Sequence, residues 1–327
     1  MKTVLVTGGA GYIGSHTLEE LRASGFDPIC FDNLLTGFRS FARGVRLVEG
    51  DLARAADLER AFEAGPVDAV IHFAAHALVG ESYRNPYKYY HDNIGNALEL
   101  LEAMRRHRVG AIVFSSSCSV YGIPARVPIT EDMPLDPINP YGASKMIVER
   151  ILRDYEAAHG FRSVSLRYFN AAGADPQARM GEWHHPEEHL IPRLFQVALG
   201  EAAAAAVYGD DYPTRDGTCI RDYIHVTDLA RAHVAALEHL ARGAPSDVFN
   251  LGTGAGYTVL EVLEQARAAT GAAIPAQRNP RRPGDPPELV ADATKARTVL
   301  GWVPRHSSLE EIVETAWAWH RRRAKGG

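Results

Sequence analysis

A short apolar run that leads straight into clustered glycines limits what this chain can fold into more than any other feature. Residues 4–7 read VLVT and residues 8–14 read GGAGYIG, before an amphipathic stretch. Gly8, Gly11 and Gly14 permit a tight turn and let a phosphate approach the free N–H groups at a helix N-terminus. The pattern predicts a strand, a turn and a helix that bind the pyrophosphate of a dinucleotide.

Acidic residues after the next two apolar runs narrow the choice of dinucleotide. Asp32 follows the run PICF, and Asp51 follows the run RLVEG. A carboxylate at Asp32 accepts hydrogen bonds from both ribose hydroxyls of NAD and repels the additional phosphate of NADP, so NAD is favoured. Asp51 is expected near the adenine, with an ordinary turn residue as the alternative.

The alternation of apolar and amphipathic segments in the first half of the sequence predicts a parallel sheet. Short runs rich in Val, Ile and Phe alternate with longer amphipathic stretches, which is typical of βαβ units. We expect an α/β fold with a doubly wound parallel sheet (a Rossmann fold) and a smaller, discontinuous C-terminal lobe. Strands are expected at residues 4–7, 28–32, 46–49, 69–73, 111–115 and 163–168, and helices at 13–24, 57–63, 87–108 and 140–159.

The alternation of apolar and amphipathic segments stops after residue 170. The stretch AAGADPQARMGEWHHPEEH has no helical or strand period and is longer than most connections, which favours a functional loop. Helices are expected at 189–200, 227–242, 258–270 and 308–322, and strands at 206–208 and 248–251. We therefore expect an NAD-binding domain at 1–170, rejoined by segments near 222–250, and a substrate lobe formed mainly by 171–327.

Composition excludes several classes of protein. Of 327 residues, 46% are hydrophobic and 23% charged, with a net charge of −5. The chain therefore buries a sizeable core and has no electrostatic reason to bind nucleic acid or an anionic membrane. No apolar stretch approaches the ~20 residues that span a bilayer. Three cysteines without CxxC spacing, and an N-terminus unlike a signal peptide, favour the reducing cytoplasm.

Tyr141 and Lys145 form the first candidate catalytic pair. They lie four residues apart on a predicted helix and so share a face. An ammonium beside a phenol favours the phenolate, lowering the tyrosine pKa from its reference of ~10, so that Tyr141 can exchange a proton with a sugar hydroxyl. The preceding strand ends in serines, one of which can bond the same oxygen. The alternatives are a surface Tyr/Lys pair and serine caps of a strand end.

Further motifs link the chain to one family over essentially its whole length. They read TGGAGYIGSH, DNL, EGDL, HFAA with VGES, YYHDN, FSSSCSVYG, NPYGASK, LRYFNAAGA, HLIP, YPTRDGTCIRDYIHV and RRPGDPP. With these motifs the chain resembles the extended short-chain dehydrogenase/reductase family, and within it the branch that epimerises UDP-hexoses at C4. The resemblance implies reversible interconversion of UDP-glucose and UDP-galactose through a 4-keto sugar, with a tightly held NAD. It also implies a homodimer that pairs the helices at 87–108 and 140–159.

The resemblance implies site residues position by position. The catalytic positions are Ser117, Tyr141 and Lys145. The cofactor positions are Gly8, Gly11, Tyr12, Ile13, Gly14, Asp32, Asn33, Asp51, Leu52, Phe73, Ala74, Asn93, Ser115, Tyr141, Lys145 and Phe169. The substrate positions are Ser117, Tyr141, Tyr168, Asn170, His189, Leu190, Tyr208, Arg221, Arg282, Asp285 and Leu289. Among these, the two arginines are expected on the diphosphate, Tyr208 against the uracil and Asp285 on a ribose.

Three positions depart from the family pattern. Ala77 stands where some members have a lysine that reaches the cofactor, and His189 stands where others have an asparagine near the sugar. Leu289 is intermediate between the tyrosine that excludes N-acetylated sugars and the small residue that admits them, so we expect weak turnover of such sugars.

Histidines in the long loop raise the question of a metal. His184, His185 and His189 lie close in sequence, but the order H-E-x-x-H is absent and Pro186 interrupts the stretch. No metal site is therefore expected.

Three other functions compete with epimerisation. A nucleotide-sugar 4,6-dehydratase or decarboxylase places acids after the strand serine or threonine, where this chain has Cys118 and Ser119, so epimerisation is favoured. An NAD-sensing protein without catalysis is expected to have lost the tyrosine or the lysine. A net dehydrogenase requires free exchange of NAD and release of an oxidised product.

Overall fold

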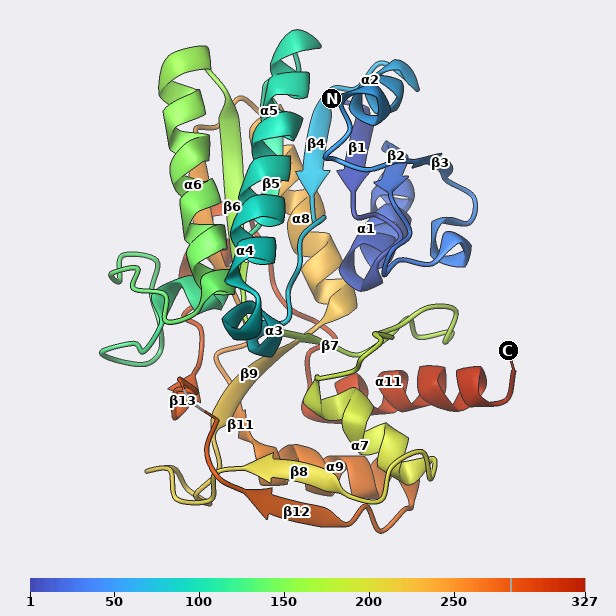
Figure 1. Cartoon of the computed structure of the whole chain (residues 1–327), viewed down its shortest axis with the longest axis vertical. Coiled ribbons are helices and arrows are strands. Elements are labelled where there is room, and N and C mark those ends of the chain that lie inside the picture. The colour runs from blue at the N-terminus through green and yellow to red at the C-terminus, as the bar shows by residue number, and fades with distance from the viewer. Residues whose placement is uncertain (283, 327) are drawn as a thin grey trace.

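In a computed structural model that describes residues 1–282 and 284–326, a seven-stranded parallel sheet crosses the upper part of the molecule (Figure 1). The strand order is β10-β6-β5-β4-β1-β2-β3. The strands are β1 (Thr3–Thr7), β2 (Asp27–Asp32), β3 (Arg46–Glu49), β4 (Ala69–His72), β5 (Ala111–Ser115), β6 (Arg162–Tyr168) and β10 (Asp247–Leu251). The order reverses between β1 and β4, and such a switch point opens a ligand crevice at the carboxyl ends of the strands.

Helices cover both faces of this sheet, because its strands are apolar on both sides. Val4 and Val6 of β1 pack with α1 (Tyr12–Ala23) and α8 (Val226–Ala241), whereas Leu5 faces the opposite layer. That second layer is formed by α2 (Ala55–Glu63), α5 (Asn96–Arg106) and α6 (Pro140–His159). The alternation along β1 follows from the two-residue period of a strand. The expected doubly wound α/β fold is confirmed.

The smaller lower part of the molecule is built from short strands and three helices (Figure 1). β9 (Ile220–His225) pairs with β7 (Asn170–Ala172), β11 (Gly256–Thr258) and β13 (Glu288–Leu289), and β8 (Ala205–Tyr208) pairs with β12 (Ala276–Asn279). Phe195, Leu263 and Ile312 form its core on α7 (Leu190–Ala198), α9 (Val259–Thr270) and α11 (Leu309–Ala324). The described residues include no helix with the length and apolarity that a bilayer crossing requires.

Several elements differ from the sequence expectation. The helix expected at 87–108 is divided into α4 (Pro86–Lys88), a π-helical segment η2 (Tyr89–Gly95) and α5. Strand β9 was not expected, because Arg221 and Asp222 hide its apolar pattern. Also unexpected are α3 (Val79–Arg84), α10 (Thr294–Val299), the 3-10 turns η1 (Arg39–Ala42) and η3 (Cys118–Tyr121), and the short strands β7, β11, β12 and β13, which are two to four residues long.

Candidate active site

The glycine loop between β1 and α1 has no room for side chains at two of its positions. A Cβ on Gly8, whose φ is +73°, would lie 2.7 Å from the backbone nitrogen of Ala74. A Cβ on Gly14 would lie 2.2 Å from the carbonyl oxygen of Gly8. Gly11 caps α1 without a side-chain hydrogen bond, so the first N–H groups of the helix remain free to meet an anion. The loop is therefore a cradle of the shape that a pyrophosphate requires.

Asp32 joins this loop to the end of β2. Its buried carboxylate accepts hydrogen bonds from the backbone nitrogens of Ala10 (2.9 Å) and Leu34 (2.8 Å). Burial raises the pKa of Asp32, and these two hydrogen bonds oppose the shift. A carboxylate offers about four acceptor positions, so two remain for ribose hydroxyls.

Other expected cofactor residues surround the cradle. The hydroxyl of Tyr12 donates to the carbonyl of Gly173 (2.7 Å), which ties the loop to the segment after β7. The amide of Asn33 donates to Asp51 (3.1 Å). Phe73 and Ala74 follow β4, where both backbone nitrogens donate to Thr7. The remaining expected contacts, Ile13 and Leu52, pack into the hydrophobic clusters on the two faces of the sheet.

Asn93 holds protein rather than presenting a free amide. Its oxygen accepts from the backbone nitrogen of His76 (2.8 Å), and its nitrogen donates to the carbonyl of His76 (3.1 Å) and to Ser144 Oγ (3.0 Å). The π-helical turn η2 places this amide between the loop after β4 and α6, which explains why the expected helix is interrupted. His76, the neighbour of Ala77, also pairs with Asp92.

The catalytic candidates meet where α6 begins beside the carboxyl end of β5. Asn139 caps α6 by accepting from Gly142 N (2.8 Å), which starts the helix one residue before Tyr141. A Cβ on Gly142 would lie 2.4 Å from the carbonyl oxygen of Ser119. The start of α6 therefore packs closely on residues 115–119, called the serine turn below, which include Ser117. One turn later, Lys145 Nζ donates to the carbonyl of Ser115 (2.7 Å). Ser117, Tyr141 and Lys145 are all buried.

Burial controls the protonation of this group. It raises the pKa of Tyr141 to about 12, and the hydrogen bond with Ser117 opposes that shift. It lowers the pKa of Lys145 to about 7, against the attraction of Glu149. The expectation that Lys145 lowers the tyrosine pKa is therefore wrong for the chain alone. Desolvation acts on both groups, and Lys145 Nζ lies 5.9 Å from the centre of the Tyr141 ring.

A buried ion pair behind the serine turn was not expected from the sequence. Arg167 donates to both carboxylate oxygens of Glu149 (2.9 and 2.6 Å), and Ser116 Oγ donates to Glu149 as well (2.5 Å). The neighbouring Ser115 and Tyr168 share a hydrogen bond between their hydroxyls. These contacts fix the two serines that precede Ser117, and only the three-dimensional pairing of β5, β6 and α6 reveals them.

The expected UDP-binding residues gather in the lower part of the molecule. Arg221 on β9 forms an ion pair with Asp285 and donates to the carbonyl of Pro286 (2.9 Å). The guanidinium of Arg282 lies 4.0 Å from the centre of the Tyr208 ring. Both arginines lower the pKa of the Cys219 thiol, although burial raises it overall.

Four other expected substrate positions lie on β13, on β7 and at the start of α7. Leu289 lies opposite Arg221 in the pairing of β13 with β9, and Asn170 lies opposite Tyr223. Phe169, an expected cofactor contact, packs with Cys118 in the same hydrophobic cluster as Leu289. Leu190 is the first residue of α7, and His189 is its N-cap.

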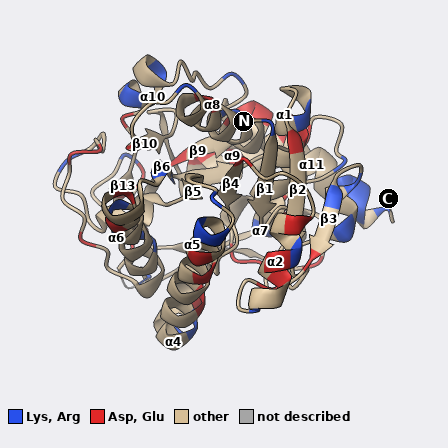
Figure 2. Cartoon of the chain, turned by 90° about the horizontal axis from the view of Figure 1, so that it is seen from above, with Lys and Arg blue, Asp and Glu red and all other residues tan. Residues whose placement is uncertain are grey.

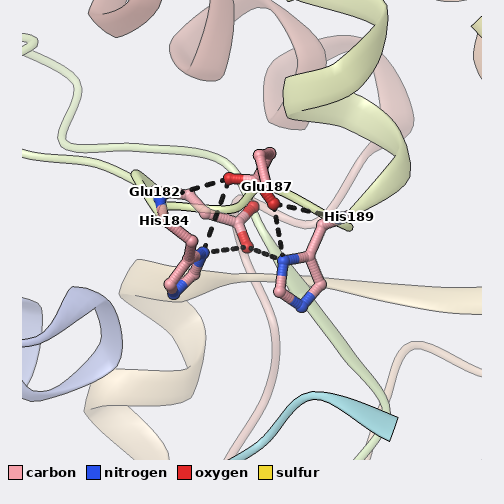
Figure 3. Close-up of side chains that lie close together, drawn as sticks. All are labelled: Glu182, His184, Glu187 and His189. Atoms are coloured by element: carbon pink, nitrogen blue, oxygen red, sulfur yellow. Dashed lines mark hydrogen bonds and ion pairs between the residues drawn. The ribbon is translucent and has the colours of Figure 1, made fainter. Parts of the chain in front are cut away.

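His189 belongs to a cluster of which the sequence analysis named the histidines His184 and His189 but not the two glutamates. Its Nδ1 lies 2.9 Å from Glu187 and 3.0 Å from Glu182, and His184 faces the same two carboxylates (Figure 3). Burial alone lowers the pKa of His189, but the two carboxylates raise it well above its usual value. The pattern E-x-H-x-x-E-x-H is the signal that was available, whereas the exposed His185 lies outside the cluster.

Comparison with known proteins agrees with this arrangement. The profile of the NAD dependent epimerase/dehydratase family matches residues 4–252. A UDP-glucose 4-epimerase of Lacticaseibacillus casei is 47% identical over 325 residues, covering 99% of this chain and 98% of that protein. The crystal structure of UDP-glucose 4-epimerase from Brucella ovis in complex with NAD superposes with a TM-score of 0.95 at 49% identity, covering 98% of this chain and 99% of that one. The Bifidobacterium longum enzyme in complex with NAD+ and UDP gives 0.94 at 42% identity, covering all of both chains.

Proposed function

Because the chain belongs to the NAD dependent epimerase/dehydratase family, we propose that it is a UDP-glucose 4-epimerase. It interconverts UDP-glucose and UDP-galactose by inverting C4 of the hexose, with NAD as cofactor. The observation that carries this assignment is the buried group Ser117, Tyr141 and Lys145 beside a glycine cradle, in a chain with UDP-glucose 4-epimerases as full-length relatives.

The residues of the cradle fit NAD. The space that a Cβ on Gly8 or Gly14 would fill, and the uncapped N-terminus of α1, suit a pyrophosphate. The free acceptor positions of Asp32 suit two ribose hydroxyls and oppose a phosphate. The chemistry that NAD supplies when bound is reversible uptake of a hydride from C4 of the hexose, which passes through a 4-keto sugar.

The protein's own groups handle the proton of the sugar 4-hydroxyl. Tyr141 Oη exchanges this proton, and Ser117 Oγ bonds the same sugar oxygen. The buried phenol is protonated in the chain alone because its pKa is about 12. We assign the stabilisation of the phenolate in the complex to a protonated Lys145, although in the chain alone burial keeps the pKa of Tyr141 high. Because the pKa of Lys145 is about 7, this ammonium can be present at neutral pH.

UDP is held by the lower part of the molecule. We assign its diphosphate to Arg221 and Arg282, because a guanidinium fork matches phosphate oxygens. Tyr208 offers an aromatic face for the uracil, and Asp285 a carboxylate for a ribose hydroxyl. The corresponding domain division is residues 1–170, with segments near 222–250, for NAD and mainly 171–327 for the UDP-sugar. In support, β10 pairs with β6 and α8 packs on α1.

Dehydration of the sugar is the nearest competing reaction, and the site argues against it. The positions after Ser117 are Cys118 and Ser119, which offer no acid for a departing hydroxyl. Glu149 is the carboxylate behind the serine turn, but both of its oxygens are bound by Arg167.

The chain acts as a homodimer through α5 and α6. These helices lie side by side at one edge of the molecule (Figure 2). Leu98 on α5, and Tyr87 and Tyr90 on the segments just before it, leave 37, 72 and 40% of their surface exposed, and exposed apolar residues of this kind favour an interface. Light scattering should give a dimer for the parent and a monomer for Leu98→Asp. Val299→Asp, at an exposed apolar residue on α10, is the control that should stay dimeric. A monomeric parent would contradict the assignment.

Cytoplasmic location is part of the same proposal. Cys30, Cys118 and Cys219 are buried free thiols, which suits a reducing compartment. Fractionation of cells that express the chain tests this point.

Proton NMR of the purified protein with UDP-galactose and no added cofactor tests the reaction itself. The anomeric signal of UDP-glucose should grow until the two sugars reach a fixed ratio. That result means that the protein carries its own NAD and inverts C4. An unchanged spectrum, even after NAD is added, would refute the proposed reaction.

A further inference from the structure

Four side chains of the loop between β7 and α7 converge on one point (Figure 3). His189 Nδ1 lies 2.9 Å from Glu187 Oε1 and 3.0 Å from Glu182 Oε1. His184 Nδ1 lies 3.5 Å from Glu182 Oε1 and 3.5 Å from Glu187 Oε2. Each residue offers one ligand atom, and the four atoms lie within 4.8 Å of one another.

These separations are close to the edges of a small coordination tetrahedron, so small side-chain movements would bring one atom of each residue to a common ion. Zinc binds imidazole nitrogen and carboxylate oxygen at about 2.0–2.2 Å, which places neighbouring ligand atoms ~3.3 Å apart. The distances that involve Glu182 Oε1 and Glu187 Oε1, 2.9, 3.0 and 3.5 Å, lie on either side of that value, whereas His184 Nδ1 lies 3.5 Å from the other oxygen of Glu187. Imidazole with carboxylate is also a donor set that zinc accepts. The side chains are therefore arranged closely enough for one ion to bind all four.

The two buried carboxylates of the cluster need positive charge beside them, which a protonated His189 or a bound divalent cation can supply. Glu182 and Glu187 are 6% and 7% exposed, and a buried carboxylate is costly unless it is paired. In the part of the chain that the structure describes, their ion-pair partners are His184 and His189, with no lysine or arginine. A divalent cation balances two carboxylates while both imidazoles stay neutral.

A buried nitrogen without a hydrogen bond points to the same ligand. His184 Nδ1 is shielded from solvent and has no hydrogen-bond partner among the described residues, although it faces both carboxylates. Such an atom costs free energy unless something binds it. Backbone hydrogen bonds fix the carboxylate of Glu187 without an ion, because it accepts from the backbone nitrogens of His184 (3.3 Å) and His189 (2.9 Å). Ligating carboxylates are commonly fixed by hydrogen bonds of this kind.

We propose that Glu182, His184, Glu187 and His189 bind one zinc ion in a closed structural site. All four positions of the tetrahedron are filled by protein atoms, which is the arrangement of structural rather than catalytic zinc. The ion fastens the loop between two functional ends. Gly173, which accepts from Tyr12 of the glycine cradle, lies at one end, and α7 with Leu190 at the other.

Neighbouring contacts hold the same loop from outside. Trp319 Nε1 donates to the carbonyl of Glu182 (3.2 Å), and the ring of Trp183 stacks on Phe38 at 4.5 Å. The ligand backbone is thus anchored to α11 and to the segment after β2, so the site is positioned before the ion arrives.

Metal analysis of the untagged holoenzyme tests the proposal. Mass spectrometry of the metals should find about one zinc per chain, and a strong chelator should remove it with a fall in the melting temperature. Adding zinc back should restore the melting temperature. Cobalt(II) in its place should give the intense visible bands of a tetrahedral site. A chain that holds no zinc, and whose melting temperature zinc does not raise, would overturn the proposal.

Two variants and a matched control complete the test. His184→Ala and E182Q should each lose the zinc, and the second changes a ligand with almost no change in volume. His185→Ala removes an exposed histidine outside the cluster and should keep the full metal content. Retention of zinc by both ligand variants would place the ion elsewhere and refute the site. Because no readout uses a sugar, failure here leaves the proposed function standing, and the reverse also holds.

Discussion

The catalytic group and the UDP-binding group are organised in different ways. Tyr141 and Lys145 lie on one long helix whose start is fixed by a capped turn and a close backbone contact, and both are buried. Arg221, Asp285 and Arg282 come from a strand and a loop, and their charges are satisfied by one another or by an aromatic ring. The proposed catalytic group is therefore positioned in advance, whereas UDP bound as proposed would replace contacts that the protein already makes.

The largest expected effect comes from removing the phenol oxygen of Tyr141, which tests whether the catalytic group is positioned in advance. Tyr141→Phe deletes the proton-exchanging oxygen without opening the packed helix start, so kcat should fall about 10³-fold. The affinity for UDP, measured by calorimetry, should stay unchanged because Tyr141 does not hold the nucleotide. Activity near that of the parent would exclude Tyr141 as the principal acid and base.

Removing Arg221 tests the proposed UDP-binding group and should have the next largest effect. Arg221→Ala should weaken UDP binding about 100-fold, because a charged hydrogen bond to phosphate is lost and Asp285 is left unpaired. Isothermal titration with UDP measures the effect. Arg278→Ala, which removes an exposed partner of Asp210, is the control. Equal affinities of Arg221→Ala and the parent would show that the diphosphate binds elsewhere.

Leu289 tests how the two regions meet. It is half-buried, lies opposite Arg221 in the sheet and packs near Cys118, beside the serine turn. The parent should turn over UDP-N-acetylgalactosamine weakly, and Leu289→Ala should raise that rate about 10-fold relative to UDP-galactose. Rates on the two sugars decide the point. No turnover of the N-acetylated sugar by the parent would contradict the expectation.

The lowered pKa of Lys145 should change the pH dependence of the free energy of unfolding rather than activity. Its pKa is about 7 in the folded chain and about 10.4 when unfolded, so between these values the unfolded chain binds more protons. The free energy of unfolding of the nucleotide-free protein should therefore rise with pH, by about 2 kcal/mol from about pH 7 to about pH 9. Below about pH 7 this contribution is flat.

Urea unfolding of matched variants isolates that slope. Lys145→Met should lack the rise, whereas Lys88→Met, at a partly exposed lysine paired with Glu81, should keep it. The same slope in the parent and in Lys145→Met would mean that Lys145 is not desolvated as the structure indicates.

Local patterns in the sequence carried most of the prediction. The positions of most strands, the glycine cradle, Asp32 and the Tyr141/Lys145 pair depend on short spacings, so the sequence alone indicates them, whereas the order of the strands was not predicted. The amide of Asn93 binds His76 and Ser144, which are contacts between separate elements that no spacing along the chain reports. The Glu149 and Arg167 pair joins α6 to β6, and no spacing along the chain reports such a contact. The lowering of the Lys145 pKa by burial could not be predicted either, because it depends on the packing of distant segments around this residue.

The two hydrogen bonds that Asp32 accepts bear on any attempt to engineer the cofactor preference. The same carboxylate that favours NAD also holds the backbone of Ala10 in the cradle and of Leu34 in the loop beyond β2. A smaller neutral residue at this position would make room for the additional phosphate of NADP, but it would leave two backbone N–H groups without an acceptor. Redesign toward NADP therefore needs a compensating acceptor in the same step, and selection for altered cofactor use would have to change both loops together.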